Sequence, residues 1–198
     1  MKSVLASIQP KYCELIASGE KTIEVRKNKP KLDTPFKCLI YCTKAKNVYQ
    51  TYWCSNLRGN YQYIDDRSHN QFDKIGNEKV IGEFVCDNID KYSAEFVNDD
   101  CYEDIRKIDF FDDEIEELFI TSNGYENPSN CELCRQSCLS FEEIKSYIFS
   151  GESGFFDFYG WHISNLRIYD TPKELSEFNL KRPPQSWQYV ESEVEHNG

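Results

Sequence analysis

Alternating and unbroken apolar patterns predict a series of β-strands along this chain. In the second of them Ile23 and Val25 alternate with Glu24 and Arg26, so that one face is apolar and the other is charged. Gly82 interrupts a later apolar run and indicates a bulge or a close backbone approach. The expected strands cover residues 1–7, 22–26, 36–43, 80–86, 159–169 and 187–190.

Apolar residues at helical spacing, together with start and stop signals, predict several short helices. Pro10 in the first turn and Gly19 at the stop frame the first helix. Ser140 and Glu143 form a capping box that opens a later helix, and a similar box opens the last one. The expected helices cover residues 10–18, 109–119, 140–148 and 171–178.

Short helices interleaved unevenly with strands predict an α+β fold with a mixed or closed sheet. The length of 198 residues fits one domain, which we place at residues 1–190, followed by a frayed tail at residues 191–198. Residues 44–76 are polar and aromatic without a sustained period, which is typical of an insertion or a long loop. Residues 123–137 are also expected to be loop.

The formal net charge of −11 argues against a protein that coats DNA or other nucleic acids. The charge is uneven, because residues 11–46 hold nine basic and four acidic residues, whereas residues 95–126 hold two basic and twelve acidic ones. A locally basic face that accepts an anionic ligand is therefore compatible with the acidic total. No run of 18 apolar residues is present and the apolar part of the N-terminus is too short for a signal peptide. We therefore expect a cytoplasmic monomer with no membrane partner.

The nine cysteines are expected to be mostly reduced thiols. Three of them lie within apolar segments and resemble small core residues: Cys38, Cys42 and Cys86. Three others have a spacing that fits part of a zinc site: Cys131, Cys134 and Cys138. A structural zinc ion needs four ligands, and only Cys101 or His162, brought close by the fold, would supply the fourth. We therefore expect no metal and no cofactor.

The charged face of the second strand is the strongest chemical signal in the chain. An exposed strand face with a weak ion pair is the simplest interpretation of Glu24 beside Arg26. Strict alternation would place Lys21 on the same face as Ile23 and Val25. Lys21 therefore has to lie in the turn before the strand if it is to join the carboxylate and the guanidinium.

Three segments in order resemble one protein family. A Gly-x-Lys-x-x-Glu-x-Arg pattern occupies residues 19–26, an Ile-Tyr-x-Thr strand residues 40–43 and a Gly-Glu-Phe strand residues 82–84. Together they resemble the ASCH domain, the activating-signal-cointegrator homology group of PUA-like folds. The segment from 159 to 187 is similar to phage and prophage members, which implies a phage-derived protein. The resemblance implies a mixed, barrel-like sheet with flanking short helices around a cleft.

The same resemblance implies two insertions, at about residues 44–76 and 95–138, and RNA-linked ligands. Family members have proposed RNA binding, ribonuclease activity in one case, and hydrolysis of N4-acetylcytidine in another. In that amidohydrolase the positions of Lys21 and Glu83 are catalytic together with a threonine. This chain has Glu24 where the threonine stands.

Three hypotheses about function follow. The first is a module that binds RNA or a modified nucleoside in a cleft lined by Lys21, Glu24, Arg26 and Glu83, where a carboxylate accepts from an exocyclic amine. The second is a hydrolase of N4-acylated cytidine or of RNA, with Lys21, Glu24 and Glu83 as catalytic residues. The third is a protein-interaction factor that acts through the acidic segment. The charged residues of the cleft would then only neutralise one another.

Other residues are candidates for the rim of the cleft. Tyr41, Trp161 and Trp187 are suited to stack a base, although each of these residue types more often packs in a core. Arg182 stands beside two prolines that hold it stiffly, which favours a place at the rim. His162 lies on an alternating strand and is expected to make a structural hydrogen bond.

Overall fold

The computed structural model divides into two compact units. The first unit is made of Met1–Glu20, Leu32–Cys86 and Ile163–Gly198, and the second of Lys21–Lys31 and Asp87–His162. Within these units the structure describes residues 2–44, 52–56, 61–64, 72–99, 102–110, 132–149 and 154–191. Among the helices of those ranges, none is long and apolar enough to cross a membrane.

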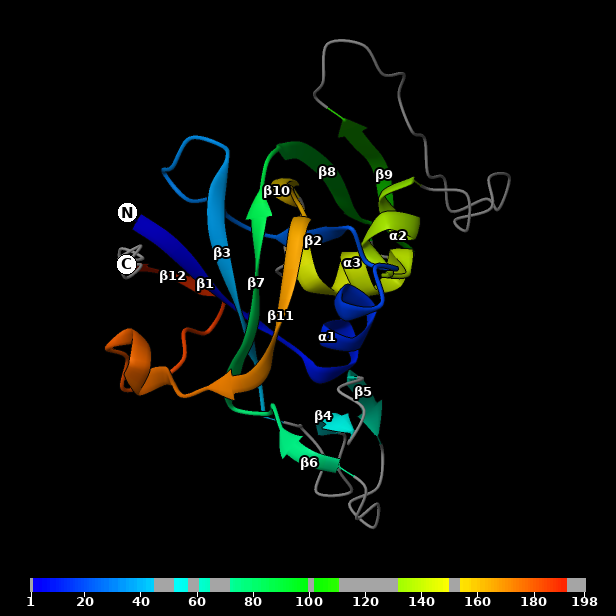
Figure 1. Ribbon diagram of the computed structural model, residues 1–198. Coiled ribbons are helices and arrows are strands. Elements are labelled where there is room, and N and C mark those ends of the chain that lie inside the picture. Colours follow the sequence, from blue (N-terminus) through cyan, green and yellow to red (C-terminus); the bar gives the residue numbers. More distant parts are fainter. Residues whose placement is uncertain are drawn as a thin grey trace. The chain divides into compact units, whose positions relative to one another are not determined.

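A five-stranded sheet forms the first unit, and its strand order is β11-β7-β3-β1-β12 (Figure 1). Its members are β1 (Lys2–Ile8), β3 (Phe36–Cys42), β7 (Lys79–Cys86), β11 (Ser164–Lys173) and β12 (Trp187–Glu191). The pair β1–β3 is parallel and the other pairs are antiparallel, so that the sheet is mixed. The unit also contains helix α1 (Pro10–Ala17) and the 3-10 helix η2 (Leu175–Phe178).

The elements of the first unit agree with the helix end signals and apolar runs of the sequence. Pro10 begins α1, and Gly19 has a φ of 81°, the left-handed region in which glycine is favoured after a helix. One face of the sheet packs a core whose members come from four of its strands: Leu5, Leu39, Tyr41, Val80 and Val190. Partly buried residues from β11 onward pack against it: Tyr169, Leu175, Phe178 and Leu180.

Gly82 lies at a close approach of two backbones, as its position in the apolar run predicts. A Cβ atom built on Gly82 would lie 2.5 Å from the carbonyl oxygen of Arg167 on β11. The register of β3 with β7 also shifts directly after the pair Ile40–Gly82. Only glycine allows β11 to pair so closely with β7 at this point.

The second unit is a four-stranded antiparallel sheet of order β2-β10-β8-β9 with two helices. Its elements are β2 (Ile23–Arg26), β8 (Ile89–Asp99), β9 (Tyr102–Phe110), α2 (Glu132–Ser137), α3 (Phe141–Ile148) and β10 (Gly154–His162). Both helices pack on one face of this sheet, through a core of Ile23, Val25, Tyr92, Ala94, Leu133, Ile144, Ile148 and Phe158. Ser140 and Glu143 form the predicted capping box of α3.

Several sequence-based expectations need correction. The expected loop at residues 44–76 contains a small sheet of order β5-β4-β6, made of β4 (Tyr52–Asn56), β5 (Tyr61–Ile64) and β6 (Phe72–Ile75). The expected loop at 123–137 ends in helix α2, and the expected helix at 109–119 begins inside β9, with its remainder outside the described residues. The mixture of polar and apolar residues in these short elements conceals their period.

The C-terminal part differs from the sequence-based expectation at two points. The expected strand at 159–169 is split at Ile163 into β10 and β11. The expected capping box at 171–174 is replaced by one between Glu174 and Glu177, because Thr171 and Lys173 still belong to β11. The fold class itself is confirmed as a mixed α+β fold. The sheets of the described residues end in edge strands and do not close into a barrel.

Candidate functional site

The charged motif leads into strand β2 (Ile23–Arg26). Ile23 and Val25 point into the core with α2 and α3, so that Glu24 and Arg26 lie on the opposite face of the sheet. Lys21 lies two residues before the first strand residue, outside the strand, which is the condition for it to join Glu24 and Arg26. Because Lys21 lies outside the strand, its side chain does not follow the alternation of β2 side chains between the two faces, and it contacts Glu24.

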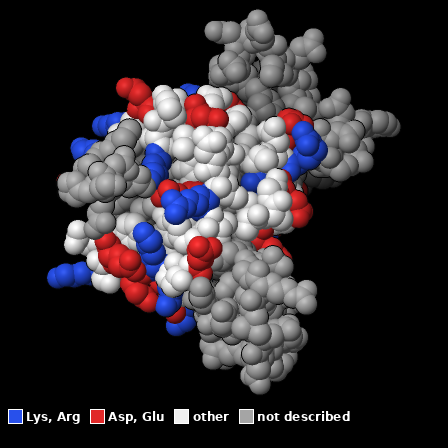
Figure 2. All heavy atoms as spheres, in the orientation of Figure 1, with Lys and Arg blue, Asp and Glu red and all other residues white. Residues whose placement is uncertain are grey.

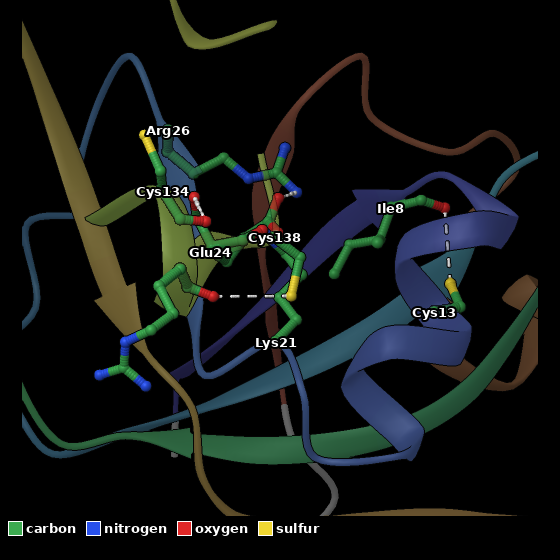
Figure 3. A network of polar contacts seen from close by, with 9 residues as sticks. Ile8, Cys13, Lys21, Glu24, Arg26, Cys134 and Cys138 are labelled. Carbon is green, nitrogen blue, oxygen red and sulfur yellow. Dashed lines mark hydrogen bonds and ion pairs between the residues drawn. The ribbon is translucent and has the colours of Figure 1, made fainter. Parts of the chain in front are cut away.

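The Glu24 carboxylate lies between two cations. Its Oε2 atom is 3.2 Å from the Lys21 Nζ atom, and its Oε1 atom is 2.9 Å from a terminal nitrogen of Arg26. Figure 3 shows the Arg26 guanidinium reaching this carboxylate. Each carboxylate oxygen thus has its own cation, and the three side chains form one network within the second unit.

Lys21 also joins β2 to the end of helix α2. Its ammonium group donates to the Ser137 carbonyl oxygen at 2.7 Å, and the Thr22 amide donates to the Gln136 carbonyl oxygen at 2.8 Å. Carbonyl groups at a helix C-terminus have no partner within the helix and carry partial negative charge, which a lysine stabilises. Ser137 is 116 residues away in sequence, and no sequence signal identifies it as a partner.

The network is nearly closed to solvent. The exposed fractions of the side chains are 1% for Lys21, 11% for Glu24 and 5% for Arg26. Desolvating three charges costs several kcal/mol per ion, and the cost is offset only when the groups are closely paired. Two ion pairs to one carboxylate meet that condition and hold the three groups in fixed positions.

Glu83, the fourth predicted cleft residue, belongs to the first unit. Its Oε2 atom accepts a hydrogen bond of 2.8 Å from the Tyr169 hydroxyl, and its Oε1 atom is 3.3 Å from the Lys37 Nζ atom. Burial and the neighbouring Glu83 carboxylate raise the pKa of Tyr169. Tyr169 therefore remains a hydrogen-bond donor to Glu83 at neutral pH. The sequence analysis did not identify this tyrosine.

The predicted rim residues differ in their surroundings. Tyr41 is 3% exposed and belongs to the core of the first unit, where burial and then Glu78 raise its pKa to about 12. Trp161 is fully buried, at 0% exposure. Trp187 is half-buried with its ring edge-on to Tyr189 at 5.5 Å, and Arg182 is exposed. Tyr41 and Trp161 are therefore core residues, which is the more common place for residues of these types.

His162 makes the structural hydrogen bond that its position predicts. Its Nε2 atom lies 2.6 Å from the Asp90 Oδ2 atom, and Asn88 donates to the other Asp90 oxygen at 2.8 Å. The hydrogen bond that His162 donates to Asp90 raises the pKa of His162, although burial opposes this shift. Burial raises the pKa of Asp90, but the hydrogen bond and charge of His162, together with hydrogen bonds from Tyr92 and Asn88, outweigh burial and lower that pKa.

The cysteines whose side chains the structure describes are small core residues or lie in and directly after helix α2. Cys38, Cys42 and Cys86 are fully buried, as predicted. Cys134 belongs to α2, and Cys138 follows the helix with a left-handed φ of 52°. In the described ranges, no group of three His, Cys, Asp or Glu side chains is placed to hold a metal ion. Two cysteines of the zinc hypothesis lie outside these ranges: Cys101 and Cys131.

Charge on the described surface is mixed. Figure 2 shows Lys and Arg side chains among Asp and Glu side chains on the face in view, with both signs over much of the described surface. The structure describes no side chain of the acidic segment at 95–126.

Comparison with known proteins identifies the family. The model of the ASCH domain matches residues 7–134, which is more than half of the chain. The chain therefore belongs to the ASCH family, within the PUA-like folds. No match was found among curated proteins.

Solved structures agree with this assignment at the level of the fold. The crystal structure of ASCH from Zymomonas mobilis has a TM-score of 0.52 and 15% identity, over 96% of this chain and 89% of that chain. Two further structures of the Zymomonas protein, with a Tyr-to-Phe and a Ser-to-Ala substitution, each have a TM-score of 0.50 and 15% identity over 96% of this chain. The alignments cover 91% of the chain with the Tyr-to-Phe substitution and 88% of the chain with the Ser-to-Ala substitution. Identity this low shows the shared fold alone.

Proposed function

We propose that this ASCH protein binds RNA or a modified nucleoside through Lys21, Glu24 and Arg26. The observation that carries the proposal is the buried network in which one carboxylate is held by two cations at the start of β2. Stability alone does not require such a network, because apolar side chains of similar volume often replace buried ion pairs at no cost. The motif also belongs to the segment that matches the ASCH model.

The chemistry of the three groups suits a nucleobase or a phosphate. A glutamate accepts a hydrogen bond from the exocyclic amine of cytosine, and an arginine donates two parallel hydrogen bonds to an anion. The side chains are nearly closed to solvent, so that a ligand has to displace the groups that cover them. We therefore expect binding to be accompanied by a local rearrangement.

Hydrolysis of an N4-acylated cytidine, or of RNA, is the second candidate function. A lysine beside a carboxylate is favourable for it, because the cation stabilises a developing oxyanion while the carboxylate activates water. Water would then break the amide C–N bond of N4-acetylcytidine and give cytidine and acetate. Lys21 and Glu24 of the second unit are the residues proposed for this reaction.

A binding and turnover assay tests both candidates. The probes are N4-acetylcytidine and a single-stranded RNA oligonucleotide, with affinity measured by calorimetry and acetate release by chromatography. We expect Lys21→Met and Arg26→Gln to weaken binding of a probe at least tenfold. Lys21→Met keeps the Glu24–Arg26 pair, so that the variant retains part of the network.

Lys27→Gln is the matched control. Lys27 is exposed and directly follows the motif, and its Nζ atom lies 5.5 Å from the ring centre of Tyr147 on α3. It should bind both probes as the wild type does. Turnover abolished by Lys21→Met would establish the hydrolase. A wild type that neither binds nor hydrolyses either probe would contradict both candidates and favour a protein-interaction factor.

A further inference from the structure

The face of the second unit's sheet opposite α2 and α3 carries a row of side chains along β10. Phe156 and Phe158 pack toward the helices, so that Phe155, Asp157 and Tyr159 point to the other face. Of these, Phe155 is 74% exposed, which is unusual for a large apolar side chain on a sheet. Isolated exposed apolar residues need no explanation, but this one stands in line with a second aromatic ring.

Two lysines accompany this row from neighbouring elements. Lys29, which follows β2, holds its ammonium group 5.7 Å from the centre of the Tyr159 ring. Lys91 on β8 is the register partner of Tyr159 and pairs with Asp157 at 2.7 Å. Both lysines are exposed. Aromatic rings interleaved with cations are the composition of surfaces that bind single-stranded nucleic acids.

We propose that this face is a binding track for single-stranded RNA, with Phe155 and Tyr159 stacking two bases and Lys29 and Lys91 contacting phosphates. The inference rests on the proposed function, and of its two ligands it selects single-stranded RNA and adds a second set of contacts for it. Tyr159 is the register partner of Arg26, so that the track begins directly beside the buried network.

The spacing of the two rings argues for a strand as the occupant. Four residues along a β-strand span about 13 Å. Aromatic rings in contact have their centres about 4.5–7 Å apart, so that Phe155 and Tyr159 do not stack on each other and each ring has room for a base of its own. Successive bases of one strand would occupy the two rings together.

The charges on this face limit the electrostatic part of binding. Asp157 on this face is held by Lys91 and by a hydrogen bond from Ser93. A phosphate at Lys91 has to replace an exposed ion pair, which is worth less than about 1 kcal/mol. We therefore expect about two phosphate contacts and a weak salt dependence, with a slope of log K against log salt near −1.4.

The test uses the whole protein, a short single-stranded RNA and free N4-acetylcytidine as probes. Phe155→Ala and Tyr159→Ala should each weaken RNA binding at least fivefold and leave nucleoside binding unchanged, since base stacking on one aromatic ring contributes this much or more. Lys29→Gln and Lys91→Gln should each reduce the salt slope by about 0.7. Phe155 and Lys29 are exposed, so that their variants are expected to fold.

Tyr147→Ala and Lys27→Gln are the matched controls, because they alter an aromatic ring and a lysine that meet at α3. They should bind RNA as the wild type does. The inference is overturned if Phe155→Ala and Tyr159→Ala bind RNA with wild-type affinity. In that case the proposed function stands when Lys21→Met still weakens binding, and it falls separately when Lys21→Met also has no effect.

Discussion

Glu24 is the residue on which the site depends. It is the shared partner of Lys21 and Arg26, and without its charge two buried cations would face each other. The alternation of β2 predicts the charged face, and it implies that Lys21 can join this face only from a position outside the strand. It does not predict the depth of burial or the Ser137 carbonyl, because both depend on α2, more than 100 residues further along the chain.

Glu24→Gln should therefore destabilise the protein by about 3–5 kcal/mol, the usual cost of removing one partner from a buried ion pair. The substitution preserves the volume and removes only the charge. Urea unfolding followed by circular dichroism measures the difference. Asp157→Asn is the control, because it breaks the exposed pair with Lys91 and should cost less than about 1 kcal/mol. Equal small effects of both substitutions would show that the network contributes no net stability.

The His162–Asp90 pair predicts a pH dependence of stability. The raised pKa of His162 contributes stability below the unfolded value near 6.5, and this is lost as the pH rises through the folded pKa. The lowered pKa of Asp90 contributes stability above its unfolded value of 3.8, and this is lost as the pH falls through the folded pKa. The pair therefore stabilises the fold most between about pH 4 and pH 6.5.

Urea unfolding at a series of pH values measures this dependence, and His162→Gln should flatten it above pH 6.5. Titration of the His162 ring proton by NMR should give a pKa above that of an exposed histidine. A His162 pKa below 6.5, or an unchanged pH profile in the variant, would contradict the role given to Asp90.

At the scale of elements, the sequence predicts those with a regular period and clear end signals. α1, α3, β3 and β7 follow from Pro10, the Ser140 capping box and continuous apolar runs. The sequence does not predict β4, β5, β6 or α2, because these elements are short and have neither a regular period nor clear end signals. The end of β11 is a further failure, because pairing with β7 extends the strand past Thr171 and overrides a local capping pattern.

Ser140→Ala should destabilise the protein by about 1 kcal/mol, since it removes the acceptor that satisfies the Glu143 amide at the start of α3. Thermal unfolding measures the shift. Ser146→Ala is the matched control on the same helix, where the serine hydroxyl only bonds the Glu143 carbonyl and is exposed. It should be neutral or slightly stabilising, because alanine is the better helix former. A control as damaging as Ser140→Ala would mean that the capping box is not the cause.

At the scale of the whole molecule, the order of motifs in the sequence predicts the ASCH family, and the family match confirms this prediction. The single domain at 1–190 and its two insertions remain predictions, and the described chain divides into two compact units. Three motif residues gather in the second unit, whereas Glu83 has its partners Tyr169 and Lys37 in the first. Sequence order cannot predict this division, because the first unit is assembled from three separate segments.

The central claim is that the ligand binds at the network of Lys21, Glu24 and Arg26. Amide chemical shifts of the wild-type protein, recorded as N4-acetylcytidine or single-stranded RNA is added, test it without any substitution. We expect the largest changes at residues 21–26 and at the end of α2, where Lys21 contacts the Ser137 carbonyl. Saturable changes confined to other parts of the chain, or no change with either probe, would contradict the claim.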